Sequence, residues 1–126
     1  MFNYRARLQP PACFAQPVDY YTTALHELCH WTGHPSRLNR VQRQGRDIEA
    51  YACEELVAEI GAAFLCAHVA LPARLEHASY IDGWLDALRG DKRLIFVAAG
   101  AAQKAADFVL GAACAGESPA VESEAA

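Results

Sequence analysis

Apolar side chains recur at helical spacing along most of the chain, and this pattern predicts a mainly helical fold. Asp19 is a residue type that caps helix N-termini, and an apolar pattern follows it. The pattern consists of Tyr21, Leu25 and Leu28. Gly33 and Pro35 are typical of the residues that end a helix. We therefore expect a first helix from Asp19 to about Thr32.

A second, long helix is expected in the middle of the chain, after a polar loop at residues 36–45. Asp47 can cap this helix, and it should end near Val69, because Pro72 disfavours helical backbone at Leu71. Its apolar stripe is expected to consist of Leu56, Ile60, Ala63, Phe64 and Ala67.

Two more helices are expected in the second half of the chain. One should run from about Ser79 to Arg89 and end at Gly90, and the next can begin at Asp91. The apolar pattern of this last helix is lost after Gly111. The acidic tail, which is rich in small residues, is expected to be disordered.

Alternating polar and apolar residues from Tyr4 to Leu8 indicate a short strand, which Pro10 ends. The predicted fold class is therefore mainly α, or α+β, with about four helices and a short N-terminal strand or small sheet. A chain of 126 residues is long enough for one domain with a hydrophobic core. We place that domain at residues 1–112 and the tail at 113–126.

Charge and cysteine content restrict the classes of function. A net charge of −4 argues against a free-standing nucleic-acid-binding domain. The one basic stretch, which we interpret as a solvated loop in preference to a phosphate contact, contains Arg37, Arg40, Arg43 and Arg46. The five cysteines include no CxxC pair, which favours a reducing, cytoplasmic environment. Apolar runs shorter than about 20 residues argue against a membrane span or partner.

A His-Glu-x-x-His motif carries the candidate chemistry. His26 and His30 are four residues apart, so a helix presents both imidazoles on one face. Neutral imidazole suits Zn²⁺, which takes three protein ligands in catalytic sites and leaves a position for water. Glu27, beside the pair, is the candidate general base. The motif therefore predicts one zinc ion per chain.

The third ligand has several candidates. A third histidine at the spacing HExxHxxGxxH is excluded because position 36 is Ser. His34 follows the expected end of the helix and is a weaker candidate, as is Glu54. We favour Glu55, because Glu59 lies one turn later on the same face and can accept a hydrogen bond from the second ring nitrogen of a ligating histidine.

Three small residues near these ligands have structural interpretations. Cys29 and Cys53 could place a thiol near the metal, but we interpret both as small buried apolar residues. Gly61 permits a close approach of the two helices, which would help to bring Glu55 to the histidines.

Three stretches of the chain resemble the zincin-like metallopeptidase domain of ArdC-type antirestriction proteins and related conjugative DNA-primase-like proteins. They run from Tyr20 to Arg40, from Tyr51 to Ala67 and from Tyr80 to Phe108. The resemblance implies a role in mobile-element DNA transfer and in protecting incoming DNA from restriction. It also implies an N-terminal domain that binds single-stranded DNA, which we expect this chain not to contain.

The zinc pattern of that family corresponds to His26, Glu27, His30 and one of the two adjacent glutamates, Glu54 and Glu55. The first functional hypothesis is a gluzincin-type peptidase that hydrolyses a peptide or protein substrate with metal-activated water. Candidate donors to the oxyanion are Tyr51, Tyr80 and His34. The alternatives are a non-catalytic, metal-stabilised module that contributes to protecting single-stranded DNA, and a helical domain without metal.

Overall fold

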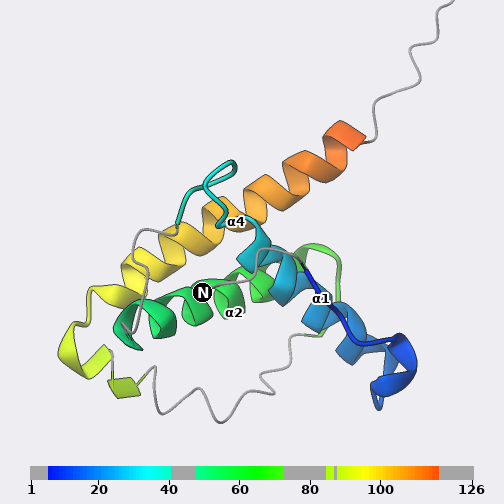
Figure 1. The fold of residues 1–126 in the computed structure, drawn as a ribbon, viewed down its shortest axis with the longest axis horizontal. Coiled ribbons are helices and arrows are strands. Elements are labelled where there is room, and N and C mark those ends of the chain that lie inside the picture. The colour runs from blue at the N-terminus through cyan, green and yellow to red at the C-terminus, as the bar shows by residue number, and fades with distance from the viewer. Residues whose placement is uncertain (1–5, 41–47, 73–84, 87, 117–126) are drawn as a thin grey trace, which may run out of the picture.

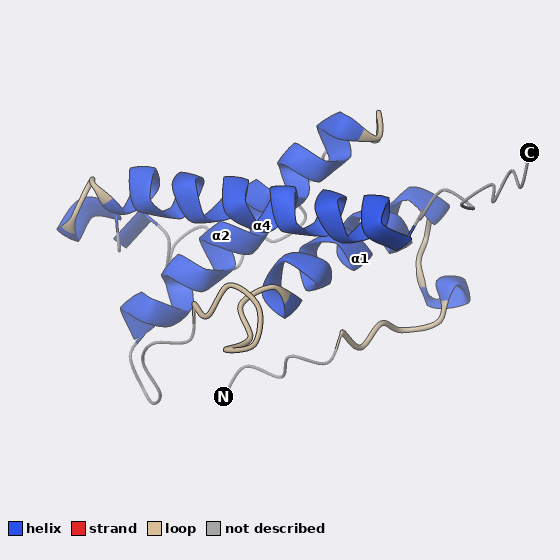
Figure 2. Ribbon diagram, turned by 90° about the horizontal axis from the view of Figure 1, so that it is seen from above, coloured by secondary structure: helices blue, strands red, loops and turns tan. Residues whose placement is uncertain are grey.

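The computed structural model describes residues 6–40, 48–72, 85–86 and 88–116. Within these ranges all regular structure is helical, which confirms the mainly helical fold class (Figure 2). The elements are η1 (Pro11–Cys13), α1 (Pro17–Trp31), α2 (Ile48–His68) and α4 (Leu94–Gly116). Residues 85–86 and 88–90 are also helical, as expected, and the rest of that predicted helix lies outside the described residues.

Helix α2 is the central element, because it packs against both α1 and α4, which touch each other much less. Figure 1 shows the three helices crossing one another instead of forming a parallel bundle. A shared cluster fills the junction of all three, and its buried members are Cys29, Ala58, Leu65, Ala105 and Ala106. Its side chains are mostly small, so the helix backbones can approach closely.

The prediction of the apolar stripe on α2 is partly wrong. Leu56 and Ile60 do pack against the core, but Phe64 and Ala67 are exposed. The stripe assumed one buried face, whereas α2 is covered by α1 on one side and α4 on another. Its buried apolar residues are therefore spread around the helix and are Ala52, Val57, Ala58, Ala62, Leu65 and Cys66.

Helix α1 begins two residues earlier than predicted, and Asp19 is not its cap. Gln16 occupies the cap position and Pro17 the first helical position. Proline suits that position because its fixed φ is already helical and its missing N–H has no partner to lose there. Asp19 lies in the first turn, where a negative charge interacts favourably with the helix dipole. The predicted end near Thr32 is confirmed.

Helix α4 also differs from the prediction at both ends. It begins at Leu94, because Asp91 forms the turn before it by accepting hydrogen bonds from the backbone and side chain of Arg93. It continues through Gly111 to Gly116, four residues beyond the predicted domain boundary, because the residues after Gly111 include alanines with high helix propensity. Residues 117–126 lie outside the described ranges.

The predicted strand is not present in the described part of its range. Residues 6–8 have no regular structure, and Tyr4 and Arg5 lie outside the description. A strand needs a neighbouring strand for its backbone hydrogen bonds, and the described partners are helices. Separately, the segment Leu94–Ala112 is long and apolar enough to span a membrane by length and composition alone. Ala98 and Ala102 of this segment pack against Val57 of α2, and 22% of the segment is buried in the described structure.

Candidate metal centre

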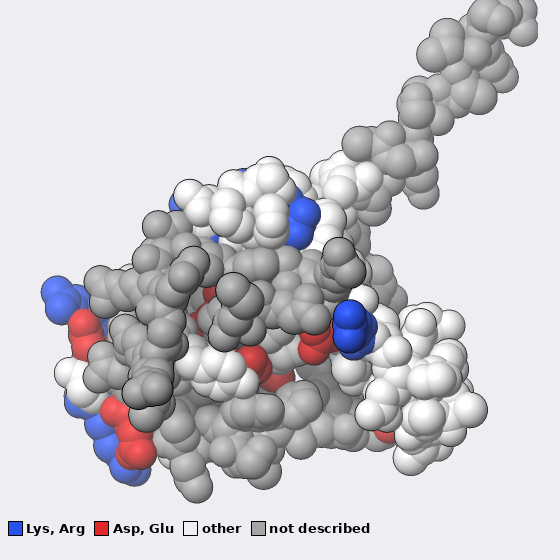
Figure 3. Space-filling view, viewed as in Figure 1, with Lys and Arg blue, Asp and Glu red and all other residues white. Residues whose placement is uncertain are grey.

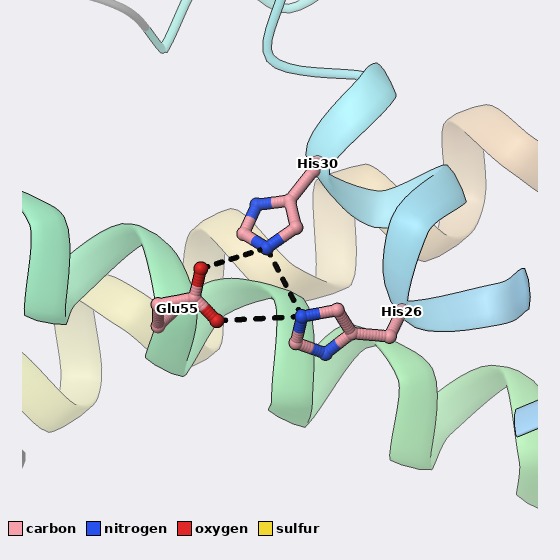
Figure 4. A group of neighbouring side chains, drawn as sticks. All are labelled: His26, His30 and Glu55. Carbon is pink, nitrogen blue, oxygen red and sulfur yellow. Dashed lines mark hydrogen bonds and ion pairs between the residues drawn. The ribbon is translucent and has the colours of Figure 1, made fainter. Parts of the chain in front are cut away.

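The two motif histidines meet at the inner face of α1. His26 and His30 lie one helical turn apart, and their rings are nearly perpendicular, with an interplanar angle of 80° and centroids 4.7 Å apart. Their Nε2 atoms are only 3.0 Å apart (Figure 4). Both side chains are largely buried, so this pair of nitrogens is held in place by the surrounding helices.

Glu55 reaches the same point from α2. Its Oε1 lies 3.1 Å from Nε2 of His30, and its Oε2 lies 3.4 Å from Nε2 of His26. Figure 4 shows the carboxylate facing both rings across the gap between the helices. In the described part of the chain, these three residues form the group that could hold a metal ion, with ligand atoms all within 4.8 Å of one another.

The outer nitrogens of both rings also face carboxylates. Nδ1 of His26 lies 3.0 Å from Oε1 of Glu59, and Nδ1 of His30 lies 3.4 Å from Oε1 of Glu54. In neutral rings these partners favour the tautomer in which each Nδ1 carries hydrogen, so each Nε2 has a lone pair for a cation bound between the rings and Glu55. A carboxylate behind each ligating histidine is the usual arrangement in protein metal sites. Two imidazole nitrogens and a carboxylate oxygen are the ligand types that Zn²⁺ takes.

Protons compete with a metal ion for the position between the two Nε2 atoms and Glu55. Burial alone lowers the pKa of His26 and His30, but hydrogen bonds and charges from the surrounding glutamates outweigh it and raise each pKa to about 9. Burial conversely raises the pKa of Glu55, but hydrogen bonds from both histidines outweigh it and lower that pKa to about 2. At 3.0 Å, N–H groups on both Nε2 atoms repel each other, and the charge of His26 accordingly lowers the pKa of His30 in part. A single cation bound by both lone pairs removes this conflict.

The candidate base, Glu27, lies on α1 beside His26 and is half-buried. Among the described residues, its carboxylate makes no hydrogen bond or ion pair. A carboxylate without a competing partner can accept a proton from a water molecule.

The weaker ligand candidates lie elsewhere or have other partners. Nδ1 of His34 lies 2.7 Å from Oγ of Ser36, at an exposed turn. Burial raises the pKa of Cys29 to about 12, so its thiol stays neutral, and burial also raises the pKa of Cys53. Neither cysteine belongs to the metal-ligand group in the described residues. Tyr51 is exposed on α2, and Tyr80 lies outside the description.

Arg40 is a residue whose role the sequence reasoning missed. The interpretation of its loop as solvated is wrong for the two arginines that the structure describes. Arg37 packs over the Trp31 ring at 3.9 Å, and the Arg40 side chain is only 12% exposed and ion-paired with Glu54. The signal that could have found it is Glu54 itself, since a buried carboxylate needs a cationic partner. On the face in Figure 3, the visible Lys and Arg side chains are scattered and form no single basic patch.

Similar proteins of known structure share this fold. Crystal structures of the antirestriction protein ArdC from plasmid R388, one Mn(II)-bound and one metal-free, both align with a TM-score of 0.73 and 50% sequence identity. The alignments cover 81% and 84% of this chain and 38% and 39% of ArdC, respectively.

Similar sequences occur in longer proteins. The DNA primase TraC of Escherichia coli is 47% identical over 100 residues, which are 77% of this chain and 9% of TraC. The uncharacterized protein y4eC of Sinorhizobium fredii is 44% identical over 100 residues, which are 78% of this chain and 33% of y4eC. The chain thus spans a minor part of each relative. A family model described as a zincin-like metallopeptidase matches residues 5–101, and the chain therefore belongs to this zincin-like metallopeptidase family.

Proposed function

We propose that this domain binds one zinc ion through His26, His30 and Glu55 and hydrolyses peptide bonds with Glu27 as general base. The observation that carries the proposal is the convergence of two Nε2 atoms and one carboxylate from two helices. Glu59 and Glu54 support it by facing the Nδ1 atoms, which leaves both Nε2 lone pairs for the metal.

The proposed mechanism assigns one task to each group. When bound, a divalent cation supplies a Lewis acid that polarises a carbonyl and makes a neighbouring water more acidic. Glu27 takes a proton from the attacking water and passes it to the leaving amine. His26, His30 and Glu55 hold the cation. Tyr51 and His34 are the described candidate donors to the oxyanion.

Zinc is our choice of metal because its affinity for sites with imidazole ligands exceeds that of manganese. The similar ArdC protein has a Mn(II)-bound crystal structure, so a divalent cation in this family site need not be zinc. Metal analysis of the purified protein therefore has to compare both ions.

A second candidate function is a non-catalytic, metal-stabilised module. It is favoured by the relatives, which are an antirestriction protein and DNA primases instead of peptidases of known substrate. Under this proposal the domain contributes to the protection or transfer of single-stranded DNA in the cytoplasm. With a net charge of −4, DNA contact would come from other parts of a longer protein.

The first experiment measures metal content by elemental analysis on protein purified without a histidine tag. The parent should carry about one metal ion per chain, because the three ligands together form one site. The variants His26→Ala and Glu55→Ala should lose this ion. If Glu55→Ala retains metal, the third ligand must be a residue other than Glu55. If the parent protein takes up neither zinc nor manganese when they are supplied, the proposal of a metal site is wrong.

The second experiment separates the two functions with Glu27→Gln. A peptidase should keep its metal but lose about 10²- to 10⁴-fold in turnover of a fluorescent casein or peptide mixture. Asp107→Asn, on the exposed side of α4, is the control and should behave like the parent. Metal-loaded parent protein that cleaves no peptide would favour the non-catalytic module.

A further inference from the structure

The guanidinium of Arg40 makes four hydrogen bonds beside the metal centre. Nη2 donates to the carbonyl oxygen of Cys29 at 2.6 Å and to Oε1 of Glu54 at 2.9 Å. Nη1 donates to Oγ1 of Thr32 at 2.7 Å, and Nε donates to Oε2 of Glu54 at 3.1 Å. Arg40 therefore ties the C-terminal end of α1 to α2, the two helices that carry the candidate ligands.

Glu54 connects this arginine to the metal centre. Its Oε1, which accepts from Arg40, is also the oxygen that faces Nδ1 of His30 at 3.4 Å. Nε2 of the same ring points at Glu55. A continuous path therefore runs from guanidinium to carboxylate to imidazole, all in side chains that are only 12–13% exposed.

We propose that Arg40 is a positioning residue of the metal centre, acting on His30 through Glu54. The inference rests on the proposed metal binding. Arg40 has two effects: it holds Glu54 where its carboxylate can orient the His30 ring, and it occupies both oxygens of Glu54. Two adjacent glutamates, Glu54 and Glu55, lie beside the histidines. Because Arg40 binds the carboxylate of Glu54, only Glu55 remains available as a metal ligand.

The geometry requires arginine and not another cation. A planar fork with five N–H donors can reach the two oxygens of Glu54, the Thr32 hydroxyl and the Cys29 carbonyl together, whereas a lysine ammonium is a point charge with three donors. Gly33 leaves room for the fork, because a β-carbon there would lie 3.1 Å from Nη2 of Arg40.

The test compares Arg40→Lys with Arg37→Lys in the full 126-residue chain. Arg37 is a matched control, because it lies in the same loop and donates to the Trp31 carbonyl at 2.6 Å but makes no contact with Glu54. Zinc affinity is measured by competition with a chromophoric chelator. Arg40→Lys should weaken it about 10- to 100-fold, the usual effect of removing a group that orients a ligand, while Arg37→Lys stays close to the parent.

A second variant and a spectroscopic signature keep the inference falsifiable if Arg40→Lys folds poorly. Glu54→Gln preserves side-chain volume and should weaken zinc affinity by a similar factor. In zinc-loaded protein with ¹⁵N-labelled histidine, Glu54→Gln and folded Arg40→Lys should shift the Nδ1 resonance of His30 and leave that of His26 unchanged. A general loss of packing would move both resonances.

The outcomes separate the two proposals. A parent chain that binds no metal would overturn the proposed function, and the inference would fall with it. A parent that binds zinc, with affinity unchanged in both Arg40→Lys and Glu54→Gln, would overturn the inference alone. Equal losses of affinity in Arg40→Lys and Arg37→Lys would also overturn it, because the effect would then come from the loop as a whole.

Discussion

Gly61 of α2 lies directly against Cys29 of α1. A β-carbon built on Gly61 would be only 2.7 Å from Sγ of Cys29, closer than nonbonded atoms can pack. Cys29 is fully buried and immediately precedes His30. The missing side chain at residue 61 therefore sets how closely the helix with the two histidines approaches the helix with Glu55.

Replacing Gly61 by alanine should destabilise the protein. Alanine favours helical backbone, but here the added methyl group must push α1 and α2 apart or displace Cys29. Overpacking of this kind costs about 1–3 kcal/mol, more than the roughly 0.5–1 kcal/mol that alanine gains over glycine within a helix. The free energy of unfolding, measured with urea on metal-free protein, should therefore fall in Gly61→Ala.

Two further variants control this prediction. At Gly100 of α4, a β-carbon would meet nothing within 4 Å, so Gly100→Ala should be neutral or stabilising. The double variant Cys29→Ala with Gly61→Ala removes the sulfur from the clash and should recover part of the loss. A destabilised Gly100→Ala, or no loss in Gly61→Ala, would contradict the steric explanation.

The sequence allowed prediction of the parts of the site that depend on local spacing. The i, i+4 relation of His26 and His30 needs only a helix, and the structure brings them together with Glu55; their role as metal ligands stays a prediction. Glu59 lies one turn beyond Glu55 and faces His26, also as predicted. The expected close approach at Gly61 is confirmed by its contact with Cys29.

The missed features depend on tertiary contacts that spacing does not encode. Arg40 is one arginine among four in a polar stretch, and only the folded loop brings it to Glu54. Spacing alone predicts Glu54 as a weaker metal ligand, whereas the structure pairs it with that arginine and with Nδ1 of His30. The stripe on α2 was misplaced for a similar reason, because one amphipathic period cannot describe a helix packed on two sides.

Glu59→Gln should weaken metal binding without abolishing it. The carboxylate of Glu59 lies 3.0 Å from Nδ1 of His26, and a neutral amide there would make the ring a poorer ligand. Chelator competition should show a loss of about 10- to 100-fold in zinc affinity, with stoichiometry unchanged at saturation. Asp107→Asn is the surface control. Complete loss of metal would indicate that Glu59 is itself a ligand.

The stability of the metal-free protein should depend on pH through the same cluster. Folding raises the pKa of His26 from 6.5 to about 9, so the stabilisation from its proton is complete below pH 6.5 and is lost as pH rises through 9. Folding lowers the pKa of Glu55 from 4.5 to about 2, so its contribution is complete above pH 4.5 and is lost as pH falls through 2. The stabilising contributions of both groups are therefore complete between pH 4.5 and 6.5.

Urea unfolding of the chelator-treated protein across this pH range checks the prediction. The free energy of unfolding should decline from pH 6.5 to pH 9, and His26→Ala should show a shallower decline over the same interval. An identical slope in the parent and in His26→Ala would show that other groups cause the dependence.

Metal removal should destabilise the folded protein, because the proposed ligands come from two helices. An ion that binds only the folded state stabilises it by about 2.7 kcal/mol when its free concentration is 100 times the dissociation constant. For a domain of this size, that corresponds to a change in melting temperature on the order of 10 °C. Thermal unfolding with added zinc, compared with unfolding in a chelator, should show this difference in the parent and not in His26→Ala. Equal shifts in both proteins would place the stabilising ion elsewhere, since a site without His26 lacks one of its three ligands and cannot keep its affinity.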